Sequence, residues 1–110
     1  MNHIQESDWK PFKDLHGLAL ERFCERILAD ISRAASNSSK TFYDRYLDIN
    51  FLLQDQKSQF ANAFSNPRRS AAMMQLIQMR RLGLLTDQEL SRFSKDTQER
   101  VAAVVGNGDA

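Results

Sequence analysis

The chain has 110 residues, 42% of them hydrophobic and 26% charged, with a formal net charge of +1 at pH 7. This length fits one domain that can bury a core without metal or disulfide support. So small a net charge excludes the strong electrostatic field by which a whole protein is attracted to nucleic acid or membranes. No apolar run approaches the ~20 residues that a membrane-spanning helix needs. Cys24 is the only cysteine, which excludes an intramolecular disulfide and suits a reducing compartment. We expect a soluble, cytoplasmic protein.

The first predicted helix begins near Asp8. The polar residues 1–7 are expected to be disordered, with Asp8 as the helix cap and Pro11 in the first turn. Apolar residues then recur every three or four positions, which is the spacing of one helix face. They are Phe12, Leu15, Ala19, Phe23, Ile27, Ile31 and Ala34. Cys24 and Leu28 widen this stripe, and charged residues such as Arg22 and Arg26 occupy the opposite side.

A second helix is expected after the small polar residues 35–39, which favour a break in the chain. Its apolar positions are separated alternately by four and three residues, which is the heptad spacing of a helix that packs along another helix. The seam consists of Phe42, Tyr46, Ile49, Leu53, Gln56, Phe60 and Ala63. Because further apolar residues flank this seam, we expect one continuous helix over 42–64 to be the central element, packed against at least two others.

Two helix ends can be predicted around Gly83. A third helix, with Pro67 as an early residue, should end there, because glycine readily takes the positive φ of a C′ residue in a Schellman motif. The motif pairs Leu84 with Met79. Thr86 and Glu89 then have the spacing of a capping box, which starts a fourth helix. Leu85 and Leu90 have the spacing of a hydrophobic staple at the same helix start.

Two readings remain open for residues 94–97: the fourth helix continues, or it kinks and starts afresh toward Val101. Residues 106–110 are expected to form a disordered tail. The overall expectation is an all-α fold, a small antiparallel bundle of three long helices or four. It is a single domain over residues 8–105, with a tight capped turn at Gly83–Thr86.

Little in the sequence indicates catalysis. His3 and His16 lack partner residues at metal-ligand spacing, and no glycine-rich phosphate loop is present. Cys24 lies on the apolar stripe, where a free cysteine usually acts as a small hydrophobic residue. We therefore expect no catalytic residue, no metal, no cofactor and no small-molecule substrate.

The basic residues around the third helix suggest one alternative function. No acidic residue lies between Asp55 and Asp87. A nucleic-acid-binding protein could use the basic surface of the third helix and the following turn. The candidate residues are Arg68, Arg69, Arg80, Arg81, Arg92 and Lys95.

Association with another protein is the preferred function. The apolar surface of the second helix and a group of methionines exceed what one small core absorbs, and methionine suits adaptable partner surfaces. The candidate partner-binding residues are Met73, Met74 and Leu84, with Met74 and Leu84 expected to be exposed. The partner we expect is a second copy, in a homodimer joined along the first two helices.

Overall fold

The structure is a computed structural model that describes residues 4–105, and within this range it contains helices and no strand. The predicted all-α bundle is confirmed. The elements are η1 (Glu6–Asp8), α1 (Trp9–Ala35), α2 (Phe42–Asp55), α3 (Lys57–Phe64), α4 (Ala72–Arg81), α5 (Asp87–Leu90) and α6 (Lys95–Val105). Residues 1–3 and the expected tail 106–110 lie outside the described residues.

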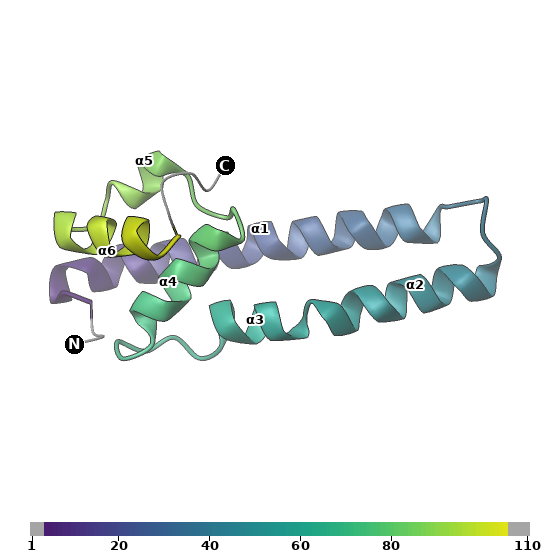
Figure 1. Ribbon diagram of the computed structural model, residues 1–110, viewed down its shortest axis with the longest axis horizontal. Helices are drawn as coiled ribbons and strands as arrows, with labels where there is room; N and C mark the ends of the chain where they lie inside the picture. The colour runs from purple at the N-terminus through teal and green to yellow at the C-terminus, as the bar shows by residue number, and fades with distance from the viewer. Residues whose placement is uncertain (1–3, 106–110) are drawn as a thin grey trace.

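A long helical hairpin forms the frame of the molecule (Figure 1). α1 has 27 residues, a length of about 40 Å at the usual rise per residue, and α2 and α3 return beside it. The shorter helices α4–α6 gather at one end of this hairpin, so the molecule is elongated, with extents of 51 × 28 × 19 Å. The single helix expected over 42–64 is interrupted at Gln56, where α2 ends and α3 begins.

The central element is α4, so the prediction that the helix over 42–64 is central was wrong. α4 contacts α1, α3 and α6. Its buried residues are Ala72, Met73, Gln75, Leu76, Ile77 and Met79. They pack with Phe12, Leu15, Ala19 and Phe23, which were correctly predicted as the buried stripe of α1. The helix starts at Ala72, later than the Pro67 start expected from the sequence.

The capped turn after α4 is confirmed. Gly83 has a φ of 73°, and the two Schellman hydrogen bonds form. The Leu84 N–H donates to the Met79 carbonyl over 3.0 Å, and the Gly83 N–H donates to the Arg80 carbonyl over 2.9 Å. The predicted capping box is present at the start of α5, where Thr86 and Glu89 exchange side-chain to backbone hydrogen bonds.

Two arginines of α1 hold this turn against the long helix. Arg26 donates to the Leu82 carbonyl over 2.6 Å, and Arg22 donates to the Leu84 carbonyl over 2.8 Å. These carbonyls lie at the negative end of the α4 dipole, where cations are favourable. Arg22 also forms a bidentate pair with Glu89, with both N–O distances 2.7 Å, and this hydrogen bonding lowers the pKa of Glu89 to about 2.

The expectation that residues 1–7 are disordered does not hold for residues 4–7. Ile4 is buried in the core, and Glu6 belongs to η1 and forms an ion pair with Arg69. The guanidinium of Arg69 also stacks on the Trp9 ring at 4.6 Å. These contacts fasten the start of the chain to the segment that precedes α4.

Asp8 occupies the N-cap position of α1, as expected, but its side chain makes no cap hydrogen bond there and instead binds the start of α6 across the fold. Its buried carboxylate accepts hydrogen bonds from the Ser94 N–H at 2.7 Å, the Ser94 hydroxyl at 2.8 Å and the Thr97 hydroxyl at 2.7 Å. Of the two readings left open for residues 94–97, the fresh start is therefore correct, because α6 begins at Lys95 immediately after this site. A buried carboxylate is tolerated there because its oxygens are hydrogen-bonded.

Replacing this carboxylate should destabilise the protein without changing its fold class. In Asp8→Asn, an amide faces the donors of Ser94 and Thr97, and we expect a loss of about 2 kcal/mol in the free energy of unfolding. Urea denaturation followed by circular dichroism measures this loss. The control is Asp55→Asn, at an exposed position, which should change stability by less than about 0.5 kcal/mol. Equal effects of the two substitutions would contradict the role of Asp8.

His16 is buried beside two aromatic rings, with centroid distances of 5.6 Å to Phe12 and 5.5 Å to Phe64. Its Nε2 atom is buried and has no hydrogen-bond partner among residues 4–105. Burial disfavours the charged imidazolium and lowers the pKa of His16 below its ordinary value of 6.5.

Stability should consequently fall as the solution is acidified. The unfolded chain takes up a proton on His16 near pH 6.5 while the folded chain resists it, so the stabilisation present above pH 6.5 declines as the pH drops below that value. Urea denaturation at several values between pH 6.5 and about 5 should show this decline, above the range where carboxylates titrate. The variant His16→Leu should have a flatter profile over the same range, and an unchanged slope would contradict the assignment.

Candidate interaction surface

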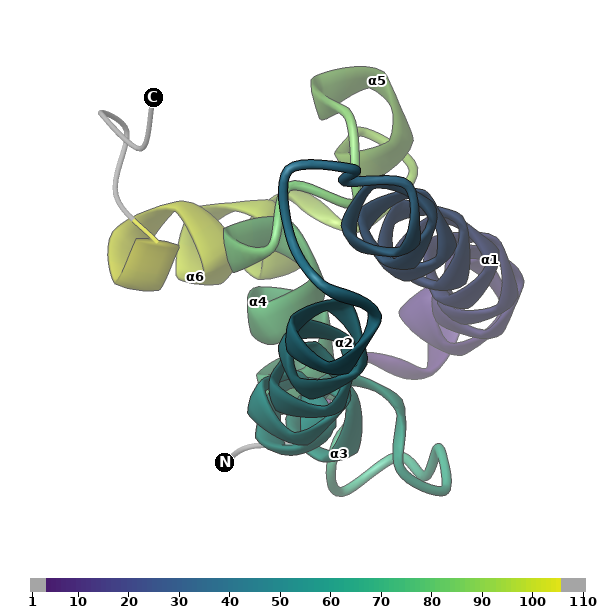
Figure 2. The same cartoon turned by 90° about the vertical axis from the view of Figure 1, so that its right-hand side faces the viewer.

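Half of the hairpin projects beyond the compact end of the molecule. We call residues 24–60 the arm; it comprises the second half of α1, all of α2 and the start of α3. Seen end-on, α1 and α2 lie side by side, with α4 and α6 set to one side of the pair (Figure 2). Within residues 4–105, the helices that α2 contacts at several positions are α1 and α3. The arm is thus two helices thick where the rest of the molecule has a further layer.

The predicted heptad seam lies on this arm, and much of it is exposed. Phe42 is 84% exposed and Tyr46 is 65% exposed, and Leu53 and Phe60 are each about two-fifths exposed. The structure describes every residue of α2, and none of them is buried. Large apolar side chains in such numbers are unusual on the free surface of a small protein and are typical of interaction sites.

The tip of the arm is well defined by polar contacts. The Thr41 hydroxyl accepts a hydrogen bond from the Asp44 N–H at 3.0 Å and caps α2. Lys40 pairs with Asp48 at 2.6 Å, and Arg45 donates to the Ala35 carbonyl at 3.3 Å. The break expected at residues 35–39 is confirmed, since α1 ends at Ala35. The Arg45 hydrogen bond joins α2 to the end of α1, and the aromatic residues Phe42 and Tyr46 stay exposed beside it.

The base of the arm is a cluster of three phenylalanines. The ring of Phe23 lies 6.1 Å from that of Phe60 and 5.5 Å from that of Phe64, and Phe60 and Phe64 are 5.8 Å apart. Tilted rings at these distances are favourable aromatic pairs. Phe23 and Phe64 are buried, but Phe60 opens to solvent. The core therefore continues into the exposed seam at this point.

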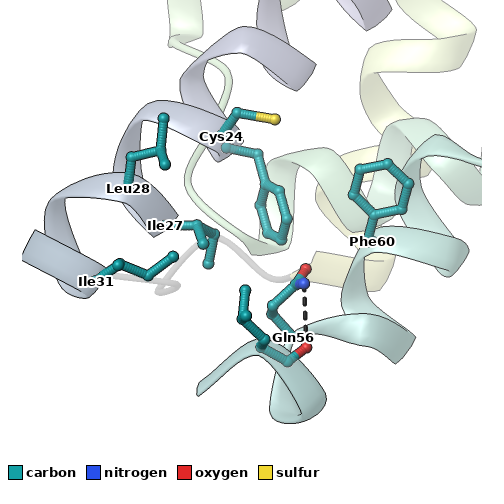
Figure 3. A pocket seen from close by; sticks show the side chains of 8 residues that line it. Cys24, Ile27, Leu28, Ile31, Gln56 and Phe60 are labelled. Atoms are coloured by element: carbon teal, nitrogen blue, oxygen red, sulfur yellow. Dashed lines mark hydrogen bonds between the residues drawn. The ribbon is translucent and has the colours of Figure 1, made fainter. Parts of the chain in front are cut away.

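An apolar groove of about 280 Å³ runs between the two sides of the arm (Figure 3). Its lining comes from α1, α2, α3 and the break between α2 and α3, and consists of Phe23, Cys24, Ile27, Leu28, Ile31, Leu53, Gln56 and Phe60. The side chains of Leu28 and Ile31 stand on one wall, and Phe60 stands on the other. The groove suits an apolar side chain from a partner better than a polar small molecule, which needs several converging polar groups.

Gln56 is the polar residue of the seam and also lines this groove. Its Nε2 donates to the Leu53 carbonyl over 3.1 Å, shown as a dashed line in Figure 3. Its Oε1 is buried and has no hydrogen-bond partner within residues 4–105. Polar atoms buried without a partner cost stability.

The groove opens on the side of α1 away from the capped turn. Successive residues of an α-helix are separated by 100°, so Leu28 lies about 160° around α1 from Arg26, which binds the turn. Cys24 and Ile31 flank Leu28 on the same side. We define the arm face as Cys24, Leu28, Ile31, Phe42, Tyr46, Leu53 and Phe60. This face is accessible without moving α4, α5 or α6.

The residues first predicted to bind a partner do not form this surface. Leu84 was expected to be exposed and this was wrong, because it is only 1% exposed. The C″ side chain of a Schellman motif packs over the helix end, and at Leu84 that position is part of the core. Met73 is also buried, whereas Met74 is 58% exposed as expected. Met74 lies on α4, outside the arm.

The basic residues of the nucleic-acid alternative do not gather in one place. Arg68 and Arg69 precede α4, whereas Arg80 and Arg81 lie at its other end, one helix length of about 15 Å away. Several of the six residues are paired with acidic side chains: Arg69 with Glu6, Arg80 with Asp87, and Arg92 with Asp14. Arg68, Arg81 and Lys95 are exposed. The paired arginines retain less capacity to neutralise phosphates.

The part of the chain that the structure describes contains neither a cluster of metal ligands nor a helix that could span a membrane. Across residues 4–105, no group of three or more His, Cys, Asp or Glu side chains is placed to hold a metal ion. In the same residues, none of the helices combines the length and apolar character that crossing a bilayer requires.

Comparison with known proteins adds no further constraint: no family model, no curated protein and no solved structure matches this chain. The interpretation of the arm therefore depends on its own geometry and chemistry.

The sequence pattern identified the residues of the arm but not their exposure. The heptad spacing of Phe42, Tyr46 and Leu53 was clear, and Cys24 and Leu28 were seen to widen the stripe of α1. The apolar surface of the second helix was expected to exceed what one small core absorbs, since two apolar faces on one hairpin outnumber what the remaining helices can cover. Which of these residues would be exposed was not predicted.

Removing the unpartnered polar atom in the groove should stabilise the chain. Gln56→Met keeps the side-chain length and eliminates the buried Oε1. It also removes the exposed hydrogen bond from Nε2 to the Leu53 carbonyl, which offsets part of the benefit, so we expect a net gain of about 0.5 kcal/mol in the free energy of unfolding. Gln54→Met, at an exposed position two residues earlier near the end of α2, is the matched control and should change stability by less than about 0.5 kcal/mol. A destabilised Gln56→Met variant would contradict this description of the groove.

Proposed function

We propose that this chain is a non-catalytic protein that acts by associating with another protein through the arm face. The observation that supports this most directly is the exposed heptad seam of α2. A heptad repeat is the pattern of a helix whose apolar residues insert between those of a facing helix. No facing helix within residues 4–105 covers most of the Phe42 and Tyr46 side chains, which remain exposed.

The composition of the arm face supports a protein partner over other ligands. Tyrosine and phenylalanine supply large contact areas and are enriched at protein interfaces. The groove beside them accepts an apolar anchor of the partner. We further propose a cytoplasmic location, because the only cysteine, Cys24, lies in this apolar groove and suits a reducing compartment.

Nucleic-acid binding through Arg68, Arg69, Arg80, Arg81, Arg92 and Lys95 is the less favoured function. Ion pairing to carboxylates weakens three of these residues as phosphate ligands. A salt titration of duplex DNA binding distinguishes the two proposals. Binding that weakens steeply with salt and on replacing Arg68 and Arg81 would favour this alternative over association through the arm face.

Photo-cross-linking in the native cell tests association directly. With p-benzoylphenylalanine in place of Tyr46, we expect protein adducts of higher mass, because this position faces the partner. The same group in place of Gln88, an exposed residue of α5, is the control and should give none. Adducts from the Met74 position alone would contradict the arm face and assign association to α4.

A further inference from the structure

The heptad spacing of the α2 seam fits a partner helix that packs along it. Heptad spacing runs from Phe42 to Leu53 within α2, a distance of about 17 Å, and resumes at Phe60 of α3 beyond the break at Gln56. A partner must present apolar side chains over that length along a nearly parallel or antiparallel helix. The arm face of the chain itself has this character, because Leu28 and Ile31 of α1 stand beside the seam.

Charge on the arm is balanced in a way that suits contact between identical surfaces. The arm carries five acidic and five basic residues, so its net charge is zero. The acidic ones are Glu25, Asp30, Asp44, Asp48 and Asp55, and the basic ones are Arg26, Arg33, Lys40, Arg45 and Lys57. Two copies therefore meet without net repulsion, whereas a strongly charged arm would exclude its own copy.

The exposed apolar area reaches the lower limit of what a stable dimer needs. Phe42, Tyr46 and Leu28 are each more than three-fifths exposed, and Leu53 and Phe60 add smaller areas. At 150–250 Å² for a fully buried aromatic side chain, the surface available around the arm face is on the order of 600 Å² per copy. Two copies then bury on the order of 1,200 Å², which is the lower limit of the range for specific protein complexes.

We propose that the partner of the arm face is a second copy of this chain, related by a two-fold axis, so that two hairpin arms form a four-helix bundle. This inference rests on the proposed function. Each arm supplies two helices and an incomplete apolar layer, and the second arm completes it. The exposed residues of each seam become the core of the bundle, and the compact ends remain outside it because α4–α6 gather at the opposite end of the hairpin from the tip of the arm (Figure 1).

Sedimentation equilibrium of the full chain over a range of concentrations tests this proposal. The wild-type protein should approach twice the chain mass of 12.7 kDa at high concentration. Tyr46→Ser on α2 and Leu28→Ser on α1 should each weaken the dimer by roughly tenfold or more, because every dimer loses two copies of the replaced side chain. Circular dichroism verifies that both variants keep their helices, as their exposure leads us to expect.

Phe51→Ser is the matched control. Phe51 is 68% exposed on the same helix, but it lies about 140° around α2 from Tyr46 and outside the seam. It should leave the dissociation constant within about twofold of wild type. Equal weakening by Phe51→Ser and Tyr46→Ser would overturn the proposed interface.

A monomer at every concentration would overturn the second-copy proposal alone. If the Tyr46 position still gave cross-linked adducts with a different protein in the native cell, the association function would stand while self-association was rejected. A dimer that persists unchanged in Tyr46→Ser and Leu28→Ser would overturn the arm face as the interface of the pair.

Discussion

A mismatch of helix lengths determines the architecture of this protein. α1 is about 40 Å long, whereas α4, which covers the core at the compact end, is about 15 Å long. The three short helices α4, α5 and α6 cannot cover both sides of the helical hairpin along its whole length. The core is therefore complete near Phe12 and Phe64, thins at Phe60, and gives way to exposed aromatic residues on α2.

Polar contacts over long sequence separations hold the short helices at the compact end. Arg22 and Arg26 of α1 bind the carbonyls that follow α4, and Asp8 binds the start of α6. Each contact satisfies backbone or hydroxyl groups that a helix end or turn leaves without a partner. By fastening the short helices around α1 as far as Arg26, these contacts leave the remainder of α1 available for other interactions.

Local features of the fold were predictable from the sequence and distant ones were not. The turn at Gly83 and the capping box at Thr86 depend on residues within a few positions of each other, so their residue types suffice. The role of Asp8 requires residues 86 positions away, which no local pattern reveals. The heptad seam of α2 indicates that another helix faces it, but the spacing does not say whether that helix belongs to the same chain.

The central claim is that the chain by itself leaves the arm poorly protected, and hydrogen exchange measured as a function of protein concentration tests it most directly. At low concentration, amides of α2 should exchange much faster than those of α4, because local opening is easiest where few apolar contacts are buried. Protection in α2 should then rise with concentration as arms associate, while protection in α4 changes less. Equal protection of α2 and α4 in the most dilute samples would contradict the account.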